Sequence, residues 1–90
     1  MVKPQFEVGK DHVGAGGVVS EPELRTGAVL AVARRAADLG WPAFDVVASP
    51  LPGPSGNVEY FLHLRSDTDR ALAGDALERA IARAVAEGPQ

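Results

Sequence analysis

The sequence predicts an α/β fold in which two strands and two helices form one end of a larger sheet. Three observations support this prediction. A helical pattern over residues 20–40 leads into an apolar strand pattern, which is the order typical of a βαβ unit. A second strand pattern and a closing helical pattern follow it. Because a two-stranded sheet is marginally stable alone, we expect the sheet to be incomplete in this chain.

The length and composition of the chain indicate one domain with a small core, since it has only 90 residues. Its hydrophobic share of 46% and charged share of 23% are typical of a globular protein. Nine Lys and Arg against twelve Asp and Glu give a net charge of -3, which argues against an autonomous RNA-binding module. The absence of cysteine excludes disulfides, and neither a membrane-spanning run nor a signal-peptide pattern is found. We expect a cytoplasmic protein.

Residues 2–19 are predicted to form a loop, because they are rich in glycine and follow neither the helical nor the strand period. The run from Gly14 to Gly17 is interpreted as a flexible connector. A nucleotide-phosphate loop would have to follow a strand and open directly into a helix. We expect a parallel strand to finish at about Met1 and Val2, which would place Lys3 at the carboxyl edge of the sheet, where open α/β sheets bind ligands.

The helix predicted over residues 20–40 has signals at both ends. Ser20 is expected to cap it, with Glu23 as the capping-box partner, and Gly40 is expected to end it in the left-handed conformation. Apolar residues recur at spacings of three and four, which predicts one buried face. The expected face consists of Leu24, Ala28, Val32, Ala36 and Leu39.

Two terminal strands are predicted within residues 43–64. Phe and Val are frequent over residues 43–49, and the loop that follows is stiffened by three prolines. Residues 57–64 alternate with the period of a strand, and both of its sides are largely apolar, so we expect both faces to be covered. Residues 67–87 are predicted to be helical with a break near Gly74, after which Asp75 and Glu78 can form a capping pair. Leu77, Ile81 and Val85 are predicted to form a narrow apolar stripe at a spacing of four.

These strand directions bring Lys3 and Glu59 together, although 55 residues lie between them. The two would meet if the strand that ends at Val2 is parallel to residues 43–49 while the last strand is antiparallel. A lysine held beside a carboxylate keeps its charge and can stabilise an alkoxide as a hydroxyl loses its proton. Spacing alone leaves open that both are ordinary surface charges, as lone charges usually are.

Other polar and aromatic residues give weaker signals. Asp11 and His12 with His63 could suggest a metal, but two histidines without a third ligand at a suitable spacing are a poor case, so no metal site is predicted. Phe6 could stack on a base, as aromatic residues do in nucleic-acid sites, or pack its loop onto the core.

Two long motifs suggest a family. VKPQFEVGKDHVGAGGVV stands near the start, ADLGW ends the helix, and SPLPGPSGNVEYFLHLR follows. In this order and spacing the motifs closely resemble the carboxyl-terminal part of the TlyA proteins, the "hemolysin A" ribosomal RNA methyltransferases. The resemblance covers the chain from Val2 to about Gly88. The last helix resembles actinobacterial members most.

The resemblance implies a Rossmann-like class I methyltransferase fold of the FtsJ-like type. It implies that S-adenosylmethionine donates a methyl group to the 2'-oxygen of cytidine in small- and large-subunit ribosomal RNA. Of the family's Lys-Asp-Lys-Glu catalytic set, the second Lys matches Lys3 in KPQFE and the Glu matches Glu59 in GNVE. The neighbouring positions of the two motifs are candidates for the substrate loops, namely Gln5, Phe6, Glu7, Ser55 and Asn57.

The family's first Lys, its Asp, its glycine-rich cofactor loop and its amino-terminal RNA-binding domain all precede the point where this chain begins. We therefore expect residues 1–90 to be a carboxyl-terminal fragment of an FtsJ-like domain, with no cofactor-binding residues of its own and no activity in isolation. An alternative of a different class stays open. The chain could be a small non-enzymatic α/β interaction module that pairs its open sheet edge with a partner chain.

Overall fold

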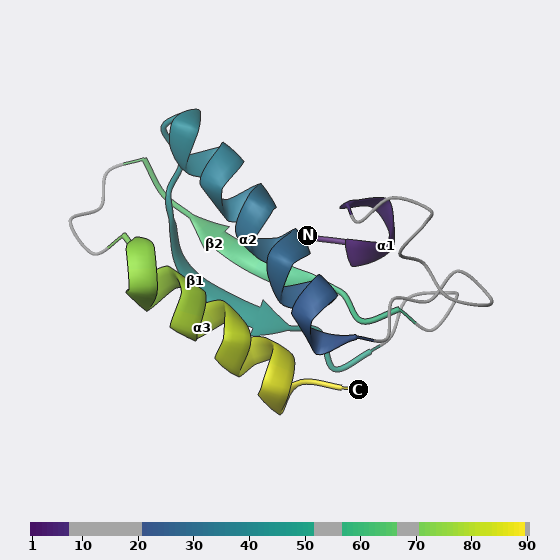
Figure 1. Ribbon diagram of the computed structural model, residues 1–90. Coiled ribbons are helices and arrows are strands. Elements are labelled where there is room, and N and C mark those ends of the chain that lie inside the picture. Colours follow the sequence, from purple (N-terminus) through teal and green to yellow (C-terminus); the bar gives the residue numbers. More distant parts are fainter. Residues whose placement is uncertain (8–20, 52–56, 67–70, 90) are drawn as a thin grey trace.

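The structure, a computed structural model, describes residues 1–7, 21–51, 57–66 and 71–89. Its elements are α1 (Pro4–Glu7), α2 (Pro22–Asp38), β1 (Ala43–Ala48), β2 (Tyr60–Leu64) and α3 (Gly74–Glu87). The two strands form one antiparallel sheet, and α2 and α3 lie side by side over the same face of it (Figure 1). The expected α/β fold, with helix, strand, antiparallel strand and helix in this order, is confirmed.

The sheet is extended at the free edge of β2 by the amino-terminal residues. Val2 pairs with Tyr60 in an antiparallel bridge, through hydrogen bonds of 2.6 Å from the Val2 N–H and 3.0 Å from the Tyr60 N–H. Tyr60 is also the partner of Ala48 in β1. The segment at Val2 and strand β1 therefore flank β2 on opposite edges, and both run antiparallel to it, so they are parallel to each other.

The core lies between the sheet and the two long helices. From α3 it takes Leu77, Ile81 and Val85, which follow the predicted spacing of four. The remaining members come from the amino terminus, α2 and the strands: Val2, Val29, Ala33, Ala43, Val46, Val58 and Tyr60. Burial of this apolar surface is the main stabilising term of a small domain.

The prediction of the buried face of α2 was partly wrong. Leu39 is 63% exposed and Leu24 is only half-buried. The buried residues are instead Arg25, Ala28, Val29 and Ala33. Helix α2 packs against α3 and against the sheet, so its buried stripe faces the line where these two neighbours meet. The apolar periodicity of α2 alone does not show that α3 and the sheet are the elements that cover it.

The helix ends differ from the predictions at their amino-terminal sides. Helix α2 begins at Pro22 with Glu21 at the N-cap position, no side-chain cap bond is found there, and Ser20 lies outside the described residues. At the other end, Gly40 has the expected left-handed conformation, with φ +91°. The capping pair predicted for Asp75 and Glu78 does not form, since the N-cap position of α3 is Ala73.

Helix α3 is shorter at its start than the predicted 67–87 segment. It begins at Gly74, where φ is +51°, after an extended Ala73. Just before it, the Leu72 N–H donates to the Ala43 carbonyl at 2.8 Å, which binds this residue to the sheet edge rather than to a helix. Glu78 accepts a hydrogen bond from Arg34 of α2 at 3.2 Å instead of capping its own helix.

The amino-terminal prediction of a loop over residues 2–19 was wrong for its first part, since residues 4–7 form the short helix α1. Pro4 is its first residue, where the fixed φ of proline suits a helix and the missing N–H costs no bond. The glycine run at 14–17 lies outside the described residues.

One face of the sheet carries no helix in the described part of the chain, contrary to the expectation of two covered faces. The cross-strand partners Val47 and Phe61 are 53% and 48% exposed there. We call this surface, with Asp45 and His63, the open face. Both long helices lie on the other face, so the apolar residues of the open face have no cover among the described residues. No described helix has the length and hydropathy that a membrane crossing requires.

Candidate active site

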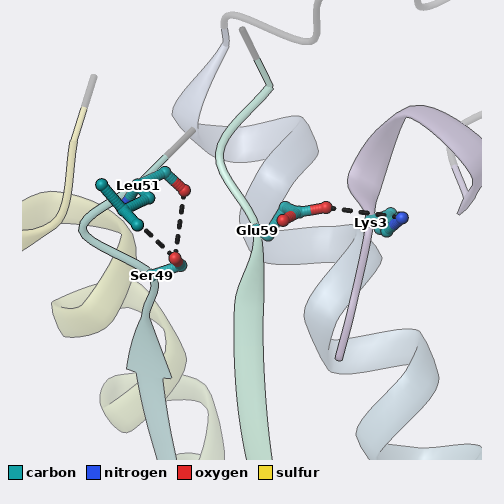
Figure 2. A network of polar contacts seen from close by, with 4 residues as sticks. All are labelled: Lys3, Ser49, Leu51 and Glu59. Carbon is teal, nitrogen blue, oxygen red and sulfur yellow. Dashed lines mark hydrogen bonds and ion pairs between the residues drawn. The ribbon is translucent and has the colours of Figure 1, made fainter. Parts of the chain in front are cut away.

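Lys3 and Glu59 form an ion pair at the edge of the sheet. The Lys3 Nζ lies 3.6 Å from the Glu59 Oε2, and the two side chains are 39% and 13% exposed. In Figure 2 the two side chains reach toward each other across the gap between the amino-terminal segment and the strand. The lysine side chain is therefore partly open to solvent, while the glutamate side chain is mostly covered.

The backbone explains why these two residues meet. Val2 and Tyr60 are directly opposite in an antiparallel bridge, so the next residue of one segment lies opposite the preceding residue of the other. Lys3 and Glu59 occupy those two positions. Side chains in such opposed positions have Cβ atoms about 5 Å apart and leave the same side of the sheet. The pairing at Val2 thus brings the charges together before any attraction acts.

The ion pair itself contributes little to stability. A distance of 3.6 Å is longer than a good charge-assisted hydrogen bond, and exposed pairs contribute about 0.2–1 kcal/mol. The arrangement is therefore better explained as a positioned charge than as a stabilising contact. A cation that faces solvent and is directed by a fixed carboxylate can stabilise negative charge on an oxygen placed beside it.

A turn after β1 lies on the other side of Glu59. The Ser49 N–H donates to the Glu59 carbonyl at 2.8 Å. The Ser49 Oγ donates to the Leu51 carbonyl at 3.0 Å and accepts from the Leu51 N–H at 3.3 Å (Figure 2). Serine turns of this kind are local and common. The sequence prediction for this loop concerned its three prolines and did not single out Ser49. The turn anchors the backbone of Glu59 from the side of β1.

The five substrate-loop candidates fall into different surroundings. Gln5 is half-buried on α1, and its Oε1 atom is buried without a hydrogen-bond partner among the described residues. Asn57 is 1% exposed and precedes Glu59 by two positions. Phe6 and Glu7 belong to α1, but their side chains are outside the description, as is Ser55. The structure therefore brings Lys3 and Glu59 together, and the roles of the other five stay predictions.

Sequence reasoning missed a buried arginine beneath this site. Arg25 is 1% exposed, and its Nη1 donates to the Pro89 carbonyl at 3.2 Å. Burial raises the pKa of Tyr60 above its usual 10.0, and the charge of the Arg25 guanidinium partly offsets the increase; the buried Tyr60 hydroxyl has no hydrogen-bond partner of good geometry among the described residues. An arginine on a helix is usually expected to be exposed to solvent, so only the three-dimensional contacts could have revealed that Arg25 is buried.

His63 does not take part in a metal site in the described residues. Its ring packs on Phe44, with centroids 4.2 Å apart, and the Arg65 guanidinium lies over the same Phe44 ring, 5.6 Å from its centroid. No group of three or more His, Asp or Glu side chains that could hold a metal is found in the part of the chain that the structure describes. Asp11 and His12 are outside that part.

The described elements form an α/β unit with a lysine–glutamate ion pair at the edge of its sheet. The family model of the FtsJ-like methyltransferases matches residues 1–66. The chain belongs to the FtsJ-like methyltransferase family. It is also 67% identical over 89 residues to the 16S/23S rRNA (cytidine-2'-O)-methyltransferase TlyA of Mycobacterium tuberculosis, which confirms the resemblance to the TlyA proteins. The match covers 99% of this chain and 33% of that protein.

Two solved structures named as hemolysins share the fold. One, a crystal structure from Lactococcus lactis, superposes with a TM-score of 0.74 at 31% identity, over 91% of this chain and 39% of that chain. The other, from Streptococcus thermophilus, also has a TM-score of 0.74, at 30% identity, over 94% of this chain and 31% of that chain. The chain thus spans about a third of the length of these relatives.

Proposed function

We propose that Lys3 and Glu59 belong to the active site of an S-adenosylmethionine-dependent methyltransferase that modifies a cytidine 2'-oxygen in ribosomal RNA. The observation that carries the proposal is the 3.6 Å contact between the Lys3 Nζ and the Glu59 Oε2 at the edge of the sheet. It is supported by family membership and by the name of the Mycobacterium tuberculosis relative.

In this proposal each residue has one task. Bound by the rest of a longer protein, S-adenosylmethionine would supply the methyl group, and negative charge would develop on the ribose 2'-oxygen that receives it as the hydroxyl proton passes to water. The Lys3 ammonium, which faces solvent, lies beside this oxygen and stabilises the charge. The less exposed Glu59 carboxylate holds the lysine ammonium in its direction through the ion pair. Correct placement of the hydroxyl supplies much of the rate.

The described residues do not by themselves fit S-adenosylmethionine. Among the grooves that described residues line, those between α2 and α3, between β1 and α3, on the open face and along α2 include neither Lys3 nor Glu59. We propose that the isolated chain neither binds S-adenosylmethionine well nor methylates RNA, and that the rest of a longer protein completes the site.

A chimera tests the role of the pair. Residues 1–90 replace the matching third of the Mycobacterium tuberculosis TlyA protein, and transfer of labelled methyl from S-adenosylmethionine to ribosomal subunits is measured. We expect Lys3→Met to lower kcat by about 100-fold or more, the usual size for loss of a group that stabilises transition-state charge. Glu59→Gln should lower kcat as well, while KM changes less in both variants.

The matched controls are Arg35→Met for the lost cation and Glu87→Gln for the lost carboxylate, since both side chains are exposed and Glu87 pairs with Arg83 rather than with Lys3. Both controls should keep kcat within about twofold, as surface substitutions usually do. Full activity of Lys3→Met would contradict the proposed role, and methyl transfer by the 90-residue chain alone would contradict the proposed inactivity.

A second candidate function is an interaction module. The observation that favours it is the open face, where Val47 and Phe61 are about half exposed. In that case the 90-residue chain should be a stable, folded oligomer at micromolar concentration. The methyltransferase proposal predicts a monomer or a loosely packed chain, so light scattering after size-exclusion chromatography separates the two.

A further inference from the structure

Glu59 lies just outside the regular part of the sheet. Strand β1 ends at Ala48 and β2 begins at Tyr60, and these two residues are the last cross-strand partners at this end. One more hydrogen bond follows them, from the Ser49 N–H to the Glu59 carbonyl at 2.8 Å. The end of a strand ladder opens more easily than its middle. The backbone of Glu59 therefore depends on what keeps Ser49 in place.

The bridge on the other edge of β2 does not replace this bond. Its two hydrogen bonds join Val2 to Tyr60, so they hold the residue after Glu59 rather than Glu59 itself. The bond from Ser49 reaches the main chain of Glu59 directly. The carboxylate that pairs with Lys3 is thus carried by a residue whose own backbone is tied to the turn after β1.

The Ser49 side chain closes that turn. Its Oγ donates to the Leu51 carbonyl at 3.0 Å and accepts from the Leu51 N–H at 3.3 Å (Figure 2). Pro50 has no N–H, so the Leu51 N–H is the first main-chain donor after Ser49. The Leu51 side chain is 74% exposed, whereas Ser49 is 8% exposed. The serine hydroxyl, and not the packing of Leu51, therefore holds the turn.

Pro50 restricts Ser49 further. A residue before proline is confined to extended conformations, and an extended Ser49 keeps its N–H directed along the ladder toward Glu59. The hydroxyl then fixes the place where the chain leaves the sheet. Alanine at position 49 would keep the main-chain N–H but remove both bonds of the hydroxyl. The turn would lose its internal links, and the last hydrogen bond of the ladder would open more often.

We propose that Ser49 is a positioning residue for Glu59, through its side-chain hydroxyl. The hydroxyl closes the turn, and the turn keeps the Ser49 N–H on the Glu59 carbonyl. This bond directs the Glu59 carboxylate toward Lys3. The proposal rests on the proposed function for the role of the Lys3–Glu59 pair, and it assigns Ser49 no contact with substrate. Misplacement on the order of 1 Å can cost about 100-fold in rate, so a partial loss of this support has a measurable effect.

The test uses the complete methyltransferase in which residues 1–90 replace the matching third of the Mycobacterium tuberculosis TlyA protein. Hydrogen exchange of the amide at position 49, followed by NMR, reports the bond to Glu59. The yield of the amide bond that a water-soluble carbodiimide forms between Lys3 and Glu59, mapped by mass spectrometry, reports the geometry of the pair. The third measurement is kcat and KM for methyl transfer to ribosomal subunits.

The variants separate the hydroxyl from the rest of the side chain. Ser49→Ala removes the hydroxyl, and Ser49→Thr keeps it. The matched control is Ser66→Ala, which removes the hydroxyl of an exposed serine just after β2. The amides of Tyr60 and Ile81 serve as internal references, because one lies in the bridge to Val2 and the other in the core of α3.

We expect Ser49→Ala to speed exchange of the position-49 amide about three- to tenfold, the size expected for loss of one hydrogen bond. The cross-link yield and kcat should each fall about three- to tenfold while KM stays within about twofold, because the turn acts on the reacting geometry and not on RNA binding. The Tyr60 and Ile81 amides should keep their protection. Ser49→Thr should recover most of each signal, and Ser66→Ala should change none.

Unchanged exchange at position 49 or an unchanged cross-link yield in Ser49→Ala overturns the proposal, and so does an unprotected Ser49 amide in the unsubstituted protein. An unchanged kcat does the same where Lys3→Met is inactive. If Ser49→Ala unfolds the protein, the Ile81 amide loses protection too, and Ser49→Cys decides, since a thiol bonds only weakly. Faster exchange at position 49 in Ser49→Cys, with Ile81 protected, supports the proposal, and unchanged exchange overturns it.

Failure of the proposed function gives a different result. Full methyl transfer by Lys3→Met would refute the catalytic role of the pair. Hydrogen exchange and cross-linking involve neither RNA nor S-adenosylmethionine, so they would still show whether the Ser49 hydroxyl holds Glu59 in position beside Lys3.

Discussion

The end of α3 lies so close to β1 that a single methyl group at Gly88 should destabilise the fold. Gly88 has φ −81° and ψ −177°, a conformation that alanine adopts without strain. The obstacle is space, because a Cβ atom added there would collide with the Ala48 Cβ and lie 2.9 Å from the Ala84 carbonyl oxygen. That carbonyl also accepts the Gly88 N–H at 2.9 Å, so Gly88 cannot move away from Ala84 without losing this hydrogen bond.

Overpacking of this kind costs about 1–3 kcal/mol. A chain of this size is stable by roughly 5–13 kcal/mol, and each kcal/mol changes Tm by about 4–8 °C. Gly88→Ala should therefore lower Tm by about 4–24 °C by the same arithmetic. Urea denaturation followed by circular dichroism measures the free energy of unfolding directly.

A matched control and a rescue make the interpretation specific. Gly27→Ala adds the same methyl group in the middle of α2 with nothing within 4 Å, so it should stabilise the chain by about 0.5–1 kcal/mol. Ala48→Gly removes one of the two obstructing groups, and the double variant should recover part of the loss caused by Gly88→Ala. A Gly88→Ala chain as stable as the original would refute the close packing of α3 on β1.

Three further predictions concern the core, the buried tyrosine and the ion pair. Ile81→Ala, at a fully buried site, should cost about 2–5 kcal/mol in urea denaturation, and a loss below about 1 kcal/mol would contradict the packing of α3. Tyr60 is the chain's one tyrosine, so tyrosinate absorbance near 295 nm reports it alone. Because its pKa is raised in the folded chain, stability is complete below the unfolded pKa of 10.0 and falls as pH rises toward the folded pKa. Arg25→Met should raise the midpoint pH of the Tyr60 absorbance titration further. A midpoint at or below pH 10.0 in the unsubstituted chain would count against the burial of the hydroxyl. Glu59→Gln should change the free energy of unfolding by less than about 1 kcal/mol, so a larger loss would mark the pair as structural.

The features that the sequence could predict are those governed by local pattern and strand direction. The stripe Leu77, Ile81 and Val85 follows from periodicity, and the left-handed Gly40 follows from helix-end chemistry. The contact of Lys3 with Glu59 followed from the relative directions of three segments, which the rules for α/β sheets restrict to few choices. The catalytic roles proposed for the two residues rest on the family resemblance.

The features that could not be predicted from the sequence depend on which elements become neighbours in the fold. The buried face of α2 includes Arg25 and excludes Leu39 because α3 and the sheet cover a stripe that hydropathy alone does not mark. The hydrogen bond from the Leu72 N–H to the Ala43 carbonyl, just before α3 begins at Gly74, follows from no local pattern. The open face, with Val47 and Phe61, likewise reflects where both helices lie rather than any pattern within the strands.

Strand β2 gives the candidate site its geometry because it lies between the other two segments. Its Tyr60 pairs with Val2 on one edge, while the Glu59 carbonyl accepts the Ser49 N–H on the other. Glu59 is therefore fixed from both sides, and Lys3 only from one. An ion pair worth less than about 1 kcal/mol could not impose this arrangement, so the backbone must position the charges. Perturbing the pairing of Tyr60 should thus affect the ion pair more than perturbing either charge affects the fold.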